Sequence, residues 1–419
     1  MKKSLVGIPA VALLGFLSAC GGNPADGQDG ASGEATLSFA SWQWQEPGRG
    51  EAIYEAVEAY NDDNPESRIE KVEINRADYE KTISTQIGSG EGPDLLVSPL
   101  PFFYTMTDSE VLVPLNDVLS SDQEEALRPN NEELVIDGDQ LALVWGIAPY
   151  ALFWNQQVLD EAGVSPPETP EELVEAASQI HERTGKIGFT TRHQLNEEAA
   201  WWDDFASWAY GFGEGWVSNG ELTIDSEENI AALETFEELY RSGAFGVGDN
   251  ASTFRSKFAA GDVGFVLDNA TVVSTSIADS EAVSASDVGS SPLPFPTGSS
   301  AAQTNVIAVN ANSHQQDLAK DFLRWLFEPE NQERLAEAQF PAATGTLAAA
   351  PEELIEANPW VEAFYTQLDD SQGTVLPGHE IQTPQIRNVI LTRVQEVLSA
   401  GTHPREALEA AQEDAERIQ

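Results

Sequence analysis

TLSFASW (residues 36–42) and EAIYEAVEAYN (residues 51–61) decide the fold class of this chain. The first stretch places two apolar side chains on one face and predicts a β-strand, and the second carries an apolar stripe at helical spacing. A short strand is expected at residues 68–74. DLLV (residues 94–97) is a continuous apolar run, which is typical of a strand covered on both faces. Strands that alternate with helices predict an α/β chain with largely parallel sheets.

The alternation continues along the chain. Further strands are predicted at residues 141–147, 151–154, 188–191, 263–267 and 304–309. Thr169, followed by proline and two glutamates, is expected to cap a helix. Ser313 has the same pattern with glutamine, and Asp225 or Ser226 is expected to open another helix. The chain from residue 351 onward is predicted to be almost wholly helical.

The N-terminus begins with two lysines and an apolar stretch (residues 6–17) that is too short to span a bilayer. Small residues then lead into Cys20, the only cysteine of the chain. This pattern resembles the lipobox of bacterial lipoproteins, which implies a signal peptide over residues 1–19 and lipidation of Cys20. A free thiol or an intermolecular disulfide is the alternative. Residues 20–34 are rich in Gly, Asp and Ser and are interpreted as a flexible tether.

Charge and cysteine content exclude several classes of function. The formal net charge is −49, so nucleic acid and anionic lipid surfaces are not expected partners. We hypothesise a saline or alkaline habitat, because salt screens the self-repulsion of such a surface; a generically soluble acidic surface is the alternative. A single cysteine excludes a disulfide framework and cysteine-based zinc sites. No cofactor and no metal are expected.

Six motifs in order resemble one family. They are GSGEGPDL (residues 88–95), LVPL (112–115), FWN with VLDEAG (153–163), TPEEL (169–173), FAAGDVGF (258–265) and LAK to FEPENQ (318–332). Together they resemble the extracellular solute-binding proteins of ATP-binding-cassette importers, in particular the carbohydrate-binding group (family 1, maltose-binding-protein-like). Trp154 and the residues after Leu267 depart from the family pattern, which leaves the ligand open.

The resemblance implies an α/β fold of the periplasmic-binding-protein type II, with two lobes and a ligand in the cleft between them. Each lobe would hold a mainly parallel sheet flanked by helices. The N-terminal lobe would comprise residues 35–145 plus 300–340, and the C-terminal lobe residues 146–299 plus 341–419. Hinge closure around the ligand is the expected motion. A lipid-anchored monomer on the extracytoplasmic face of the membrane, delivering a solute to permease subunits, is the implied biological unit.

Candidate ligand-binding residues were sought where strands end, because open α/β sheets bind ligands past the carboxyl ends of their strands. Aromatic rings cover the flat faces of sugars, and polar side chains bond the hydroxyls. The residues that meet these criteria are Trp42, Gln43, Trp44, Ser98, Tyr150, Trp201, Trp202, Asp203, Asp268 and Asn269. For each tryptophan the competing interpretation is packing in a lobe core. Because the sequence shows no cluster of Arg or Lys, a neutral mono- or oligosaccharide is the expected ligand.

Other functions stay open at this point. A polyamine or another small solute would suit an acidic cleft of the same fold. A sensor or adhesin lipoprotein of the same fold is a further alternative. A secreted glycoside hydrolase with paired carboxylates is the enzyme alternative. The sequence contains no Gly-X-Ser-X-Gly, His-Glu-X-X-His or P-loop motif, and its five histidines are scattered. A binding protein without enzymatic activity is therefore the favoured interpretation.

Overall fold

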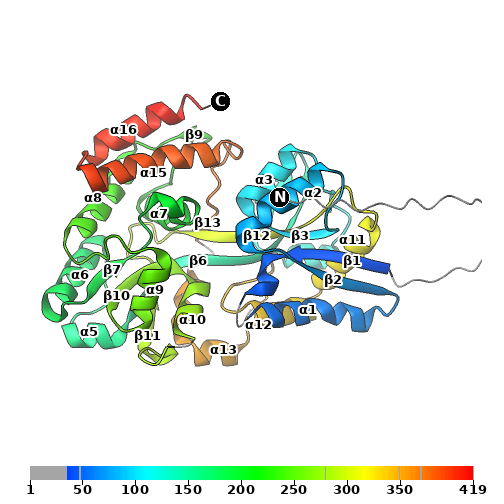
Figure 1. Ribbon diagram of the computed structural model, residues 1–419, viewed down its shortest axis with the longest axis horizontal. Helices are drawn as coiled ribbons and strands as arrows, with labels where there is room; N and C mark the ends of the chain where they lie inside the picture. Colours follow the sequence, from blue (N-terminus) through cyan, green and yellow to red (C-terminus); the bar gives the residue numbers. More distant parts are fainter. Residues whose placement is uncertain (1–34, 47–48, 279, 349, 369, 419) are drawn as a thin grey trace, which may run out of the picture.

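The chain folds into two lobes that share two long strands, β6 (Leu143–Asn155) and β12 (Ser300–Val309). In Figure 1 these strands run through the middle of the molecule, with helices packed around each end. The computed structural model describes residues 35–46, 49–278, 280–348, 350–368 and 370–418. The expected signal peptide, tether and lipidated cysteine lie outside these residues.

The N-terminal lobe contains the elements that precede β6 and two helices that follow β12. Its β-strands are β1 (Ala35–Ser41), β2 (Ser67–Glu73), β3 (Leu95–Pro99), β4 (Val135–Ile136) and β5 (Asp139–Gln140). Its helices are α1 (Gly50–Asp63), α2 (Tyr79–Gly88), α3 (Leu100–Asp108), α4 (Ser121–Glu125), α11 (Gln316–Leu326) and α12 (Pro329–Gln339), with short 3-10 helices η1 (Trp42–Gln45), η2 (Arg76–Asp78) and η3 (Pro129–Leu134).

The C-terminal lobe contains the segment between β6 and β12 together with the end of the chain. Its strands are β7 (Ile187–Thr190), β8 (Val217–Ser218), β9 (Glu221–Leu222), β10 (Val263–Asn269) and β11 (Val288–Ser291), and β13 (Ser371–Gln372) pairs with β12. Its helices are α5 (Gln156–Ala162), α6 (Pro170–Thr184), α7 (Glu198–Phe212), α8 (Glu227–Arg241), α9 (Ala251–Ala259), α10 (Ala270–Ile277), α13 (Glu352–Ala357), α14 (Glu362–Gln367), α15 (Thr383–Ala400) and α16 (Pro404–Ala415), with 3-10 helices η4 (Leu195–Glu197), η5 (Ala285–Asp287) and η6 (Pro359–Val361).

Among the described residues, the main sheet has the strand order β2-β1-β3-β12-β6-β10-β7, with β11 paired to β6 and β13 to β12, while β4–β5 and β8–β9 form separate two-stranded sheets. Pairs β1–β2, β1–β3 and β7–β10 are parallel, as the sequence predicts. The crossing strands are antiparallel to their neighbours: β12 to β3 and β6, and β6 to β10 and β11. The sheet is therefore mixed, and the expectation of mainly parallel sheets in each lobe is wrong. The chain crosses between lobes several times, so neighbouring strands in the middle run in opposite directions.

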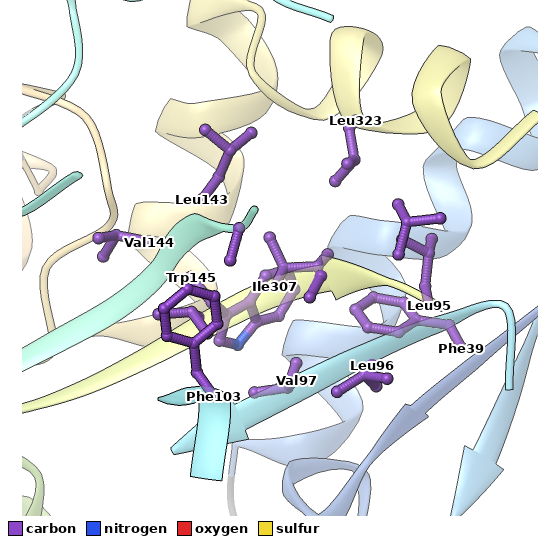
Figure 2. Packing of buried hydrophobic residues seen from close by; sticks show 14 of the residues in the cluster. Phe39, Leu95, Leu96, Val97, Phe103, Leu143, Val144, Trp145, Ile307 and Leu323 are labelled. Atoms are coloured by element: carbon purple, nitrogen blue, oxygen red, sulfur yellow. The ribbon is translucent and has the colours of Figure 1, made fainter. Parts of the chain in front are cut away.

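Each lobe has its own apolar core. Phe39, Leu95 and Ile307 lie in the cluster of the N-terminal lobe, and Figure 2 shows Trp145 beside Ile307 in this cluster. Two further clusters fill the C-terminal lobe around α7 and around β10. The separation of the clusters at the crossing strands gives the two-lobe architecture. The exact residues at which the chain divides stay a prediction.

Local signals located most element ends. Thr169 caps α6, because its Oγ1 accepts a hydrogen bond from the Glu172 amide at 3.2 Å. Ser226 caps α8 in the same way. Ser313 was expected to cap a helix, but α11 begins only at Gln316, so that prediction is wrong. The Ser313 hydroxyl instead donates to Asp94 at 2.6 Å, a contact with a residue far away in the chain.

The cap at Thr169 yields a first prediction. Thr169→Ala leaves an amide at the start of α6 without its acceptor, and we expect the free energy of unfolding to fall by about 1 kcal/mol. Urea unfolding followed by circular dichroism measures the change. Thr85→Ala, at an exposed position inside α2, is the matched control and should leave stability unchanged or slightly higher, because alanine favours helices. Equal losses in both variants would contradict the capping role.

Candidate ligand-binding cleft

Two adjoining pockets lie between the lobes. The first has a volume of about 370 Å³ and is walled by η1, the end of β2, β6, β12 and the start of α10. The second has a volume of about 350 Å³ and is walled by α2, α3, α7, β12 and α15. Arg76 and Gln303 line both pockets, so the two form one continuous cleft. Residues from both lobes and from the crossing strand β12 therefore meet at this cleft.

Trp42 and Gln43 line the first pocket, as the sequence analysis placed them. The rings of Trp42 and Tyr79 make a T-shaped contact, with 4.9 Å between their centroids. The guanidinium of Arg76 lies 4.8 Å from the centroid of the same indole. The side-chain oxygen of Gln43 accepts a hydrogen bond from the Trp145 indole at 2.6 Å. Both side chains are thus fixed before any ligand arrives.

Trp44 does not line either pocket of the cleft. Its indole NH donates to the Phe39 carbonyl at 3.1 Å, and its ring packs edge-on against Phe39, Tyr54 and Trp145 in the core. Trp44 was predicted to lie in the cleft, but the structure places it in the core of the N-terminal lobe. The stretch forms a 3-10 helix, in which residues two apart point about 240° from each other rather than to the same side.

The tandem tryptophans are core residues of the C-terminal lobe. Trp201 and Trp202 lie inside α7 and are fully buried, so their expected place in the cleft is also corrected. The Trp202 indole donates to the Thr374 carbonyl at 2.7 Å and stacks on Trp216. The next residue, Asp203, does line the second pocket. An amphipathic helix explains the difference, because consecutive side chains turn by about 100°.

The side chain of Asp203, in α7, is held by the segment that follows β13. It accepts a hydrogen bond from the Thr374 hydroxyl at 2.8 Å, and burial raises its pKa to about 6. Neighbouring arginines, Arg387 and Arg76 among them, oppose this rise. The carboxylate is therefore both held in place and exposed to the second pocket.

Four other predicted residues lie behind the walls of the cleft. Asp268 is buried and ion-paired, and Asn269 caps α10 by accepting from the Thr271 amide at 3.1 Å. Tyr150 is buried in β6, and burial raises the pKa of its hydroxyl. Ser98 is buried in β3. These residues line neither pocket, because each side chain is buried inside its own lobe.

Several lining residues were missed by sequence reasoning. Gln303 and Asn305 alternate along β12, a pattern that could have indicated two amides on one face. Asn75 and Arg76 follow β2 in the way that Trp42 follows β1, so the same rule would have found them. Arg387 lies on the last but one helix, and nothing in its local sequence points to the cleft.

The fold also brings basic residues together that the sequence keeps apart. Arg49 and Arg76 line the first pocket, and Arg76 and Arg387 line the second. Each pairs with a glutamate of its own lobe: Arg49 with Glu46 at 3.0 Å, Arg76 with Glu80 at 3.1 Å, and Arg387 with Glu198 at 2.9 Å. The sequence shows no cluster of Arg or Lys because these three arginines are far apart in the chain. Burial lowers the pKa of Arg49, and Glu46 opposes this shift.

Neither a metal-binding cluster nor a membrane-spanning helix is found among the described residues. In the part of the chain that the structure describes, no group of three or more His, Cys, Asp or Glu is placed to hold a metal ion. None of the helices among those same residues is both long and apolar enough to cross a bilayer.

Comparison with known proteins identifies the family. Residues 55–363 match the family described as bacterial extracellular solute-binding protein. The chain belongs to this family. The solved cyclic alpha-maltosyl-1,6-maltose binding protein from Arthrobacter globiformis superposes with a TM-score of 0.78 at 20% identity, over 92% of this chain and 99% of that one. This likeness confirms the two-lobe α/β fold.

Two curated relatives of this solute-binding protein carry names that refer to oligosaccharides. An arabinooligosaccharide-binding protein of Halalkalibacterium halodurans is 27% identical over half of this chain, a match that spans 47% of that protein. The diacetylchitobiose binding protein DasA of Streptomyces coelicolor is 25% identical over 81% of each chain. Both are binding proteins rather than enzymes.

Proposed function

We propose that this protein binds an extracellular saccharide in the interlobe cleft and delivers it to the permease of an ATP-binding-cassette importer. The observation that carries the proposal is the continuous cleft in which an indole, Trp42, lies among the amides of Gln43, Gln303 and Asn305. An aromatic face and several amides match the flat faces and the hydroxyls of a sugar. The names of two curated relatives support the same class of ligand.

The size of the cleft and the number of polar groups are sufficient for useful affinity. A micromolar complex needs about −8.2 kcal/mol. Burial of an aromatic side chain and a sugar face contributes about 1.5–3 kcal/mol, and each hydrogen bond to a charged group contributes about 1.5–3 kcal/mol. The summed free energy of a few such contacts exceeds about 8.2 kcal/mol. The free-energy cost of association is then subtracted from this sum.

Three further parts of the proposal follow from the sequence and the family. Cys20 carries the lipid that holds a monomer on the extracytoplasmic face of the membrane. The lobes close on the ligand by bending at the crossing strands. The protein has no enzymatic activity of its own. A polyamine is disfavoured as ligand because three arginines offset the three carboxylates that line the cleft.

Trp42→Ala tests the cleft. We expect it to weaken the binding of a saccharide by about 10- to 100-fold in isothermal titration calorimetry, because the aromatic wall of the first pocket is lost. Trp325→Ala is the matched control, because this indole packs on the core of the same lobe and donates to Asp63, away from the cleft. The control should lower stability without changing affinity.

The panel for this titration comprises mono-, di- and trisaccharides, neutral and acidic. Absence of binding across the whole panel would contradict the proposed function. If wild type and Trp42→Ala bind a saccharide with equal affinity, Trp42 is not part of the site, but the proposed class of ligand is not contradicted. Mass spectrometry of solute that is retained through purification provides an independent readout.

A further inference from the structure

Basic residues are concentrated in the cleft relative to the rest of the chain. The whole chain contains 70 acidic residues against 21 Lys and Arg. The linings of the two pockets contain three arginines, Arg49, Arg76 and Arg387, against three carboxylates, Glu46, Glu80 and Asp203. Because a surface with a net charge of −49 repels anions, an anionic ligand would need local cations of this kind.

Two of the three arginines meet in the first pocket. Arg49 and Arg76 line it with Glu46 as its carboxylate. Arg76 also lines the second pocket, with Arg387, Glu80 and Asp203, so the two linings together are formally neutral. The first pocket also contains Trp42, whose ring lies beside the Arg76 guanidinium.

The existing ion pairs leave capacity for a ligand. The pair between Arg76 and Glu80 joins one Nη to one carboxylate oxygen, and both side chains are about half-exposed. Such exposed pairs contribute about 0–1 kcal/mol, and a guanidinium has five N–H donors in a planar fork that matches a carboxylate. The Arg49 charge is disfavoured by burial, so a second anion beside it would be favourable.

We propose that the transported saccharide carries one carboxylate, which Arg49 and Arg76 bind in the first pocket beside Trp42, while neutral sugar units occupy the second pocket. This inference rests on the proposed function and specifies its substrate class as an oligosaccharide with a uronic acid unit. Glu46 and Glu80 stay beside the two arginines and repel a phosphate, which carries about −1.5 to −2 at neutral pH, more strongly than a singly charged carboxylate. It also replaces the neutral ligand that was expected from the sequence.

Matched ligand pairs test the inference by calorimetry on the soluble mature chain. The pairs are cellobiouronic acid with cellobiose, and glucuronosyl-xylotriose with its methyl ester; maltose 1-phosphate with maltose is the phosphate arm. We expect the acid to bind at least tenfold more tightly than its neutral partner, which corresponds to about 1.4 kcal/mol. The phosphate should bring no such gain.

Variants assign the effect to the first pocket. Arg49→Gln and Arg76→Gln should each remove most of the preference for the acid, measured as the ratio of the two affinities within a pair. Arg68→Gln, which removes the same charge from a half-exposed side chain of the same lobe outside the cleft, should preserve the preference. Circular dichroism and thermal melting confirm that each variant is folded.

The outcomes separate this inference from the proposed function. Neutral partners that bind as tightly as the acids would overturn the carboxylate and leave saccharide binding intact. A preference that survives in both cleft variants, or a larger gain from phosphate, would also overturn it. Failure of every acidic and neutral saccharide would overturn the proposed function itself.

Discussion

Asp268→Asn is expected to lower the free energy of unfolding by about 3–5 kcal/mol, the loss typical of removing one partner from a buried ion pair. Asp268 is fully buried and accepts from Arg255 at 2.8 and 3.0 Å, and one Nη of Arg192 lies 3.4 Å away. Asp204 is the other carboxylate of this cluster, at 2.6 Å from Arg192. Without Asp268, two guanidinium groups face one buried carboxylate.

Asp117→Asn is the matched control for this change. Asp117 pairs with Lys320 at 2.7 Å but is largely exposed, so its loss should cost at most about 1 kcal/mol. Urea unfolding at pH 7 measures both variants. Similar losses at the two positions would contradict the importance of the buried cluster.

The same variant has a defined pH dependence. Burial by itself raises the pKa of Asp268, but Arg255 and Arg192 more than offset this and hold it below the ordinary value. A lowered carboxyl pKa stabilises the fold above the unfolded-state value of about 3.9, and this contribution disappears as the pH falls through the folded-state pKa. The difference between wild type and Asp268→Asn should therefore narrow as the pH falls below about 4.

Glu133→Gln is expected to have a large effect of the opposite sign. Glu133 is the last but one residue of η3, and its Oε1 is buried and has no hydrogen-bond partner among the residues that the structure describes. Its Oε2 lies next to Gly373, on the segment after β13. A Cβ added to this glycine would be 3.0 Å from that oxygen. Tyr104, Tyr210 and Glu380 are the other titratable groups nearby, and none of them is a cation at neutral pH.

Burial raises the pKa of Glu133 from about 4.5 to about 7. A raised carboxyl pKa stabilises the fold fully below the unfolded-state value, and this contribution is lost as the pH rises through about 7. Glu133→Gln should thus match wild type near pH 4 and exceed its stability by up to about 3 kcal/mol at pH 8, at 1.36 kcal/mol per pH unit.

Unfolding in urea between pH 4 and pH 8 measures the growing difference. Glu132→Gln, at the exposed neighbouring position, is the control and should follow wild type throughout. A Glu133→Gln variant that is less stable than wild type at pH 8 would show that the carboxylate has a favourable partner in the folded state.

Much of the fold could be predicted because it depends on local patterns. Alternation of apolar residues located β1, β2 and β10, and the caps located α6 and α8. The relative direction of β6 and β12 could not be predicted, since it depends on how often the chain crosses between lobes. Residues 141–147 and 151–154 were expected as two strands, but Pro149 lies inside one long β6, paired with Ala302 where the strand changes lobes.

The cleft was harder to predict than the fold. Trp42, Gln43 and Asp203 line it, whereas the other predicted residues serve the interior of a lobe. An indole that follows a strand can point into the cleft or into the core of its lobe. The 3-10 helix η1 places Trp42 at the cleft and Trp44 in the core. Arg387 reaches the second pocket only because α15 packs beside α7, a contact between segments far apart in the chain.

The position of β12 between β3 and β6 has a consequence for biosynthesis. Val97 pairs with Ile307, about two hundred residues later, so closing this contact carries the entropy of a very long loop. A nascent chain that has emerged only as far as residue 299 holds two open sheet edges with nothing between them. Such edges invite wrong pairing, and they are closed only once β12 has been synthesised and inserted between β3 and β6.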